Sequence, residues 1–497
     1  MSFPPHPCLC DHCCGFHPRE NRLSAPPAHT CKHIRPSSLR YSGFIRFCLL
    51  LAALTASMGA QQLPQRDNKR LIAPTPPMGW NSWDSYGETV TEAQVRENAD
   101  WMAKHLKQFG WQYVVIDEGW YVQNLGAKPS DVKFSLDENG RFLPVADRFP
   151  SSANGAGFKP LADYIHSLGL KFGIHIMRGI PRASVAKNLP IADSPYTAKE
   201  AAIEDDTCPW NSFMYGIQTA PSGQAYYTSI ANLYASWGVD FIKADCISDH
   251  PYKPEEMRMI ALAILFSGRE MLLSVSPGPT SVDNAKTVSD YAEMWRISDD
   301  FWDHWGPLPD KPWSQGVRAQ FVTAAKWASF HVPGRWPDAD MLPLGHLPHP
   351  GDGGPPRNTN LTHDEQVTLL TLWCIFQSPL IMGGDLPTSD EWTTKLLTNA
   401  EVLAVDQHAS DRRPVISTDT AAVWTSKPAD GRGDYVAVFN LADKEQTLSY
   451  DWTKLQLPKG PYAVRDLWDA RDLGDAATLK VLLRPHASVL YRVVAKP

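Results

Sequence analysis

The sequence predicts an α/β fold: a (β/α)8 TIM barrel followed by a C-terminal antiparallel β-sandwich. Eight short apolar or β-rich runs recur between residues 78 and 385, and helical patterns separate most of them. After about residue 410 the pattern changes to short strands joined by turn residues. A doubly wound open sheet is the alternative, but no Gly-rich phosphate turn follows the early runs.

The spacing of apolar residues places each element. The expected barrel strands are 78–83, 113–117, 171–176, 240–245, 271–276, 293–300, 332–342 and 379–385. The expected helices are 91–109, 161–168, 225–237, 255–266, 317–329 and 364–376, with Thr91 as the N-cap of the first. The expected sandwich strands are 421–424, 435–439, 447–450, 462–466, 478–483 and 488–494. We therefore expect a barrel over residues 61–410 and a sandwich over 411–497.

Residues 1–60 are predicted to be an N-terminal extension and secretory signal peptide. Six of the nine Cys precede residue 49 in a Pro- and His-rich stretch, which indicates either a zinc cluster of unusual spacing or sequence upstream of the true start. Arg40 and Arg46 precede the apolar run 47–54 and small residues up to Ala60, a pattern typical of secretory signals. The run is too short to span a bilayer core of about 30 Å. We expect a secreted or periplasmic protein without a membrane anchor after signal cleavage.

The amino-acid composition narrows the classes of function that are possible. The chain of 497 residues is 43% hydrophobic and 20% charged, as in globular proteins, and its net charge of −7 argues against a nucleic-acid partner. Its 18 Trp are ordinary core residues that also suit contact with sugar rings.

Carboxylates follow the ends of several predicted strands, where a barrel forms its active site. They are Asp117, Glu118, Asp245, Asp299, Asp300, Asp338, Asp340 and Asp385. Such a ring can bind metal or perform acid–base chemistry. No His accompanies the acids at ligand spacing, and Lys243 and Arg296 supply positive charge nearby, so we expect no metal and no cofactor.

Two of these carboxylates suit opposite roles. Lys243 and Asp245 are two residues apart on one strand, so they share a face, and the cation favours an ionised Asp245. Asp300 would enter the reaction protonated, with Trp295 and Trp302 lowering the local dielectric. One charged and one protonated carboxyl are what glycoside hydrolysis requires.

Several motifs, in chain order, carry a family resemblance. They include TPPMGWNSW at 75–83, GWQYVVIDEGW at 110–120, WGVDFIKAD at 237–245, WRISDD at 295–300 and PGRWPDADML at 333–342. Together they resemble glycoside hydrolase family 27, the family of α-galactosidases and α-N-acetylgalactosaminidases. The resemblance extends over about residues 71–497, the sandwich included.

The resemblance implies roles for individual residues. Asp245 would be the nucleophile and Asp300 the general acid and base of a retaining double displacement, with carboxyls about 5–5.5 Å apart. Asp300 is preferred to Asp299 because it falls four residues after Arg296, as in the family motif. Trp83 would pack on the sugar, Asp117 would bind its 4-hydroxyl, and Lys243 would bind hydroxyls and keep Asp245 charged.

Other expected contacts lie around these residues. Arg296 would reach the 2-hydroxyl region and the nucleophile, and Asp340 with Met341 would line the remaining wall. His175 either binds a sugar hydroxyl or is a structural histidine. The resemblance also suggests a Cys208–Cys246 disulfide, with two buried free thiols as the alternative.

Two departures from the family pattern bear on the substrate. Glu118 stands where many members have Asp, and its extra methylene intrudes where the 6-hydroxymethyl group of galactose lies, which favours β-L-arabinopyranosides. Ser276 stands where galactosidases often have Glu, which leaves space at the sugar 2-position, as in N-acetylgalactosaminidases.

The function predicted from the sequence is a retaining exo-glycosidase that removes terminal α-D-galactosyl residues from carbohydrate substrates. The alternatives are the same mechanism on β-L-arabinopyranosides or α-N-acetylgalactosaminides, an isomalto-oligosaccharide-cleaving enzyme, or a non-catalytic carbohydrate-binding protein. The sandwich is expected to pack against the barrel and is assigned no ligand, and no oligomeric state is predicted.

Overall fold

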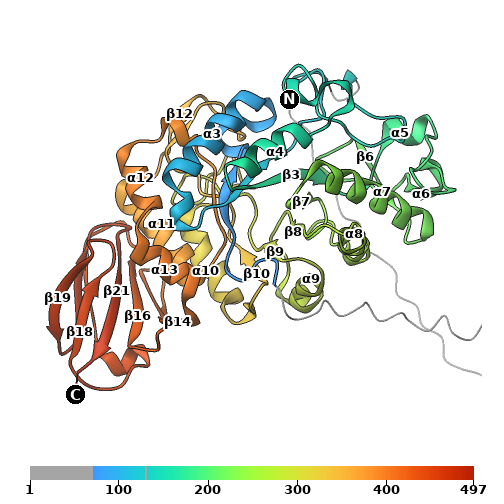
Figure 1. Ribbon diagram of the computed structural model, residues 1–497. Helices are drawn as coiled ribbons and strands as arrows, with labels where there is room; N and C mark the ends of the chain where they lie inside the picture. Colours follow the sequence, from blue (N-terminus) through green and yellow to red (C-terminus); the bar gives the residue numbers. More distant parts are fainter. Residues whose placement is uncertain (1–70, 129–130, 497) are drawn as a thin grey trace, which may run out of the picture. The chain divides into compact units, whose positions relative to one another are not determined.

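The computed structural model describes residues 71–128 and 131–496 (Figure 1). The predicted N-terminal extension, its Cys/His cluster and the signal peptide lie outside the described residues. Within the described part of the chain, no helix combines the length and the apolar character needed to cross a membrane.

The predicted barrel is confirmed as a parallel eight-stranded sheet. Its strands are β1 (Met78–Asn81), β2 (Tyr113–Ile116), β3 (Lys171–Met177), β7 (Phe241–Asp245), β8 (Leu272–Val275), β9 (Met294–Arg296), β10 (Trp336–Asp338) and β13 (Leu380–Met382). They lie in the order β10-β9-β8-β7-β3-β2-β1-β13. Leu342, in the segment that follows β10, forms a parallel bridge with Met382 of β13, so this segment meets the other end of the sheet.

Helices alternate with these strands along the chain (Figure 1). They include α3 (Glu92–His105), α4 (Lys159–Ser167), α7 (Pro221–Trp237), α8 (Pro254–Phe266), α9 (Ala285–Tyr291), α10 (Val317–Trp327), α11 (His363–Phe376), α12 (Glu391–Leu397) and α13 (Ala400–His408). Thr91 caps α3 as predicted: its side chain accepts from Gln94 N, and the Gln94 side chain accepts from Thr91 N.

Most of the strands are shorter than the apolar runs suggested, because the polar residues that follow them leave the sheet. The run expected at 293–300 pairs only over Met294–Arg296, and Asp299 and Asp300 lie in the following loop. Trp295 is fully buried in the core and does not line the cavity described below, so its expected role beside Asp300 is corrected, whereas Trp302 does line that cavity.

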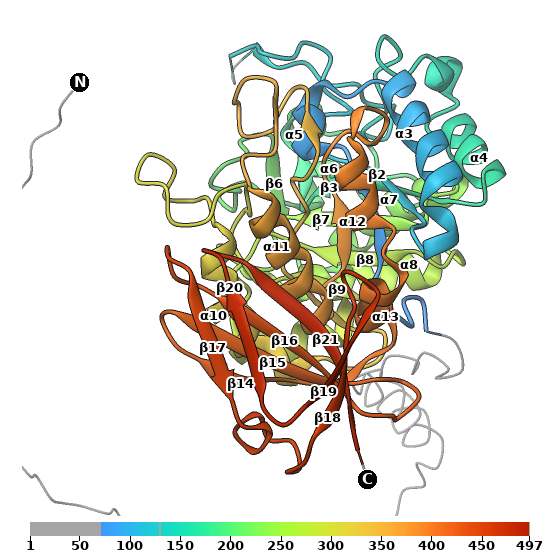
Figure 2. The ribbon, with the colours of Figure 1, turned by 90° about the vertical axis from the view of Figure 1, so that its left-hand side faces the viewer.

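The C-terminal part is the predicted antiparallel sandwich (Figure 2). One sheet holds β14 (Ser410–Ser417), β15 (Ala421–Lys427), β16 (Asp434–Asn440), β21 (Ser488–Ala495), β18 (Tyr462–Asp466) and β19 (Arg471–Ala476), and the second pairs β17 (Gln446–Tyr450) with β20 (Leu479–Leu483). A separate apolar cluster that includes Val436, Leu448 and Val493 fills the sandwich. The sequence did not predict β14 and β19, because both are edge strands without an alternating apolar pattern.

An insertion between β3 and α7 carries its own small elements. They are β4 (Ile180–Pro181), α5 (Arg182–Ala186), α6 (Ala198–Ala201), β5 (Ala202–Ile203) and β6 (Met214–Ile217). A disulfide joins Cys208 of this insertion to Cys246 at the end of β7, with 6.1 Å between their Cα atoms. The suggested pairing is therefore present, and Cys374 is a buried free thiol.

Candidate active site

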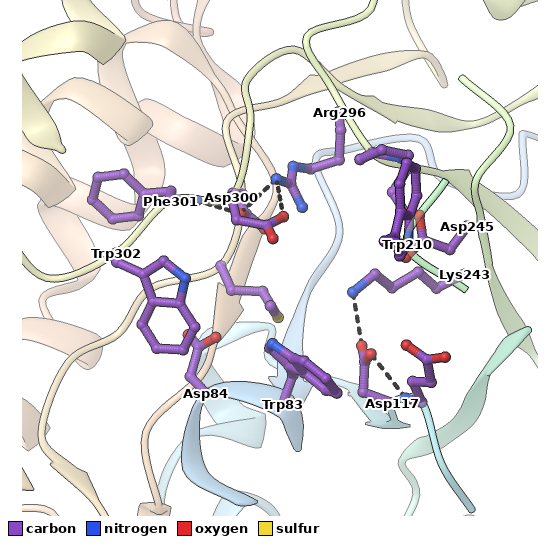
Figure 3. A pocket seen from close by; sticks show the side chains of 15 residues that line it. Trp83, Asp84, Asp117, Trp210, Lys243, Asp245, Arg296, Asp300, Phe301 and Trp302 are labelled. Atoms are coloured by element: carbon purple, nitrogen blue, oxygen red, sulfur yellow. Dashed lines mark hydrogen bonds and ion pairs between the residues drawn. The ribbon is translucent and has the colours of Figure 1, made fainter. Parts of the chain in front are cut away.

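A pocket opens at the C-terminal ends of the barrel strands, with a volume of about 560 Å³ including its open mouth (Figure 3). Its lining residues are Trp83, Asp84, Asp117, Glu118, Trp210, Lys243, Asp245, Ser276, Pro277, Arg296, Asp300, Phe301, Trp302, Asp340 and Met341. Every residue assigned a catalytic or sugar-binding role from the sequence is among them except His175. The parallel strands explain this convergence, because their carboxyl ends meet on one rim.

The floor of the pocket holds a buried ion pair. Lys243 Nζ lies 2.8 Å from Asp117 Oδ2, and Asn81 Nδ2 donates to the same oxygen at 2.7 Å. Burial would raise the pKa of Asp117, but the charges of Lys243 and His175 outweigh it and hold that pKa well below its usual range. The pKa of Lys243 is raised because Asp117, Asp245 and Asp340 overcome the effect of burial. This pair is fixed, charged and directed at the pocket.

His175 lies behind Asp245, outside the pocket lining. Its side chain is 1% exposed, and its Nε2 lies 3.3 Å from Asp245 Oδ2, while Cys246 N donates to Asp245 Oδ1 at 2.6 Å. Burial opposes ionisation of Asp245, but His175, followed by Lys243, lowers its pKa. Of the two roles expected for His175, this contact fits a structural histidine, because the side chain is buried against Asp245 and lies outside the pocket lining. His175 contributes more than Lys243 to lowering the pKa of Asp245.

Arg296 connects two carboxylates on the other side of the pocket (Figure 3). Its Nη2 lies 3.0 Å from Asp300 Oδ1 and 2.8 Å from Asp340 Oδ2. Phe301 N also donates to Asp340 Oδ2 at 2.8 Å. Asp340 is buried, whereas the Asp300 side chain is 54% exposed at the mouth. The arrangement orients Asp300 while leaving it open to solvent. Between Arg296 and Asp245 the structure shows no hydrogen bond or ion pair that would match the expected contact.

Glu118 forms part of the wall next to Asp117. Asn211 of the insertion donates from Nδ2 to Glu118 Oε1 at 2.7 Å. Removal from water raises the pKa of Glu118 to about 7, with the Asp245 charge adding to the effect and His175 opposing it. Asn211 was not expected at the site, since nothing in a loop without periodicity marks it.

Two buried oxygens on the pocket wall have no hydrogen-bond partner within the described residues. They are Ser276 Oγ and Asp84 Oδ2. Asp84 was not predicted as a site residue, although it directly follows Trp83. Burial raises its pKa well above the usual range, with the Asp340 charge contributing.

Other strand-end carboxylates do not join the pocket. Asp299, Asp338 and Asp385 lie outside its lining, and Asp385 instead accepts hydrogen bonds from Tyr86 and Asn98. Among the residues that the structure describes, no group of three or more His, Cys, Asp or Glu side chains is arranged to hold a metal ion.

Comparison with known families gives two matches. The model of "Alpha galactosidase A" matches residues 75–185 and 214–408, and the model of "Alpha galactosidase C-terminal beta sandwich domain" matches 418–493. Among curated relatives, α-galactosidase 2 of Arabidopsis thaliana is 26% identical over 91% of this chain and 97% of its own length. An α-galactosidase of Cyamopsis tetragonoloba is 29% identical over 80% of each chain.

Two of the solved structures are more similar in sequence than these relatives. A family 27 β-L-arabinopyranosidase from Geobacillus stearothermophilus is 47% identical, with a TM-score of 0.80, and covers 85% of this chain and 97% of its own. A putative α-N-acetylgalactosaminidase from Bacillus halodurans is 42% identical, with a TM-score of 0.76, and covers 86% of this chain and 99% of its own.

Proposed function

From the premise that the chain belongs to glycoside hydrolase family 27, the α-galactosidase family, and is therefore a glycosyl hydrolase, we propose that it is a retaining exo-glycosidase in which Asp245 is the nucleophile and Asp300 the general acid and base. The observation that carries the proposal is the pocket shared by these two carboxylates above the Asp117–Lys243 pair. An exo-acting enzyme fits a pocket with a closed charged floor.

The reaction proceeds in two balanced steps. Asp300 gives its proton to the glycosidic oxygen while a carboxylate oxygen of Asp245 attacks the anomeric carbon, so the leaving sugar departs as an alcohol and a glycosyl ester forms. Asp300, now a carboxylate, takes a proton from water, whose oxygen attacks the same carbon and releases Asp245. Two inversions at one carbon retain its configuration.

The chain's own residues favour each step. His175 and Cys246 N hold Asp245 by separate oxygens and lower its pKa, so it is charged before substrate binds. Asp117 and Lys243 bind adjacent sugar hydroxyls at the floor of the pocket. Trp83 packs on an apolar face of the sugar ring. The remaining hydroxyls of the sugar are bound by Arg296, Asp340 and Ser276.

The transferred sugar is proposed to be β-L-arabinopyranose in preference to α-D-galactose. The two share the same hydroxyl pattern, and galactose differs by its 6-hydroxymethyl group. Glu118 lines the wall beside Asp117 and is held there by Asn211, so its extra methylene occupies space that this group needs. The Geobacillus arabinopyranosidase, at 47% identity, supports the assignment, and the curated α-galactosidases support galactosides as further substrates.

A second candidate sugar, α-N-acetylgalactosamine, rests on Ser276. Its side chain is small and buried, and its Oγ has no hydrogen-bond partner within the described residues. A side chain this small leaves space at the sugar 2-position for an acetamido group, and the similarity to the Bacillus halodurans protein is in line with this.

The test compares kcat/KM for nitrophenyl β-L-arabinopyranoside, α-galactoside and α-N-acetylgalactosaminide. We expect the arabinopyranoside to be cleaved fastest. Glu118→Asp should raise the galactoside-to-arabinopyranoside ratio about tenfold, because one methylene less relieves the clash. Glu118→Gln, which keeps the length, is the matched control and should leave the ratio low. A galactoside preference in the wild type, or equal ratios in both variants, contradicts the assignment.

A further inference from the structure

Trp210 stands at the mouth of the pocket with its indole unusually open to solvent. It is 44% exposed, yet it lines the same pocket as Asp245 and Asp300. His250 meets it at an angle of 61°, with ring centroids 5.2 Å apart. Figure 3 shows Trp210 on the side of the pocket that holds Asp245 and Lys243, with Asp300 and Trp302 on the other side.

The chain holds this residue from both sides. Two residues before Trp210, the Cys208–Cys246 disulfide ties the loop to the residue that follows Asp245. One residue after Trp210, the buried side chain of Asn211 donates to Glu118, next to Asp117. A tetrapeptide anchored to two catalytic strands has little freedom, so the position of the indole is set by the active site itself.

The floor and the mouth of the pocket bind different parts of the substrate, and Trp210 lies at the mouth. Asp117 and Lys243 are buried at the floor and bind the transferred sugar, whereas Asp300 is exposed at the mouth and protonates the leaving oxygen. The leaving group therefore lies at the mouth, where Trp210 is exposed. Two other indoles line the pocket: Trp83 is assigned to the transferred sugar, and Trp302 is buried and leaves little surface at the mouth.

Resting on the proposed function, we infer that Trp210 is the aromatic platform for the leaving-group sugar. The apolar face of a pyranose ring packs on the indole, while Asp300 protonates the bond between the two sugars. The family model does not match residues 186–213, so this platform belongs to an insertion of this chain rather than to the matched framework.

The experiment compares two substrates with one transferred sugar. One is the glycosyl fluoride, whose leaving group has no ring, and the other is a disaccharide whose leaving group is a pyranose. The transferred sugar is whichever of arabinopyranose and galactose the wild type cleaves faster. In Trp210→Ala, the loss of kcat/KM on the disaccharide should exceed the loss on the fluoride by about tenfold.

Two further variants test whether the effect is specific to the aromatic ring of Trp210. Trp210→Phe retains an aromatic face and should recover most of the disaccharide rate. Trp313→Ala removes an indole that is 45% exposed and outside the pocket lining, and should leave the ratio of the two rates unchanged. Equal losses on both substrates in Trp210→Ala would overturn the platform, since the residue would then act on the transferred sugar or on the fold. If the wild type cleaves neither substrate, the proposed function fails instead.

Discussion

His175 and Asp245 form a buried contact that sets the charge of the proposed nucleophile. Because His175 lowers the pKa of Asp245, removing its charge should raise that pKa. The acidic limb of the kcat/KM profile, which reports the nucleophile in the free enzyme, should therefore move to higher pH in His175→Phe and His175→Gln.

His166→Phe is the matched control for this shift. His166 Nε2 lies 2.7 Å from Asp240 Oδ2, so it forms a comparable pair just before β7, at the end opposite Asp245. Its loss should leave the acidic limb where it is. An unchanged limb in both His175 variants, in protein that is folded by circular dichroism, would show that His175 is structural only.

Asp300 and Asp299 are adjacent, but only Asp300 lines the pocket and contacts Arg296. Asp300→Asn should lower kcat/KM about 10²–10⁴-fold on a disaccharide, whose leaving oxygen needs a proton, and much less on the glycosyl fluoride. Added azide should then form a glycosyl azide of retained configuration, measured by NMR. Asp299→Asn should leave both rates close to wild type, and the reverse result would exchange the two roles.

At the scale of elements, the strand-end residues were predictable and their side-chain contacts were not. Residues two apart on a strand share a face, and parallel strands end on one rim, so Lys243 and Asp245 were assigned to one site from the sequence. The contact of His175 with Asp245 depends on the register of β3 against β7, which pairs His175 with Lys243 and Met177 with Asp245. The periodicity of the sequence does not reveal the register between two strands.

The insertion between β3 and α7 shows a second limit of prediction from the sequence. Trp210 and Asn211 lie in a loop without hydrophobic periodicity, and only the folded chain brings Asn211 to Glu118, 93 residues away in sequence. The Cys208–Cys246 pair was suggested by family resemblance rather than by spacing. Edge strands β14 and β19 were missed because their exposed residues remove the alternating pattern.

The disulfide fixes the insertion to β7 and closes a loop with a sequence separation of 38. Breaking it in Cys208→Ser should lower the free energy of unfolding by about 3–4 kcal/mol on the chain-entropy estimate. Alkylation of the denatured protein checks the bond: Cys374 should react without reductant, and Cys208 and Cys246 only with it. Equal labelling of all three without reductant would exclude the bond.

At the scale of the molecule, barrel and sandwich share one apolar core in addition to the sandwich's own. That shared cluster includes Phe321 and Phe376 from the barrel helices and Trp424 and Phe439 from the sandwich strands. The rings of Phe321 and Phe439 meet edge to face with centroids 4.9 Å apart, and Phe376 meets Trp424 at 6.1 Å. Trp468 Nε1 of the sandwich also donates to Thr371 Oγ1 of α11 at 2.9 Å.

A shared core predicts that the two parts unfold together. Phe439→Ala leaves a cavity between β16 and α10 and should lower the free energy of unfolding by about 3–5 kcal/mol. The loss of activity on heating should follow the loss of sandwich structure, because the barrel helices α10 and α11 lose an apolar partner at the same time. Leu482→Ala, at a side chain that is 61% exposed on β20, is the control and should leave the melting temperature nearly unchanged. Calorimetry with a parallel activity assay tests whether the two parts unfold together. If the sandwich unfolds in a separate transition at lower temperature and activity survives it, the barrel is stable without this interface.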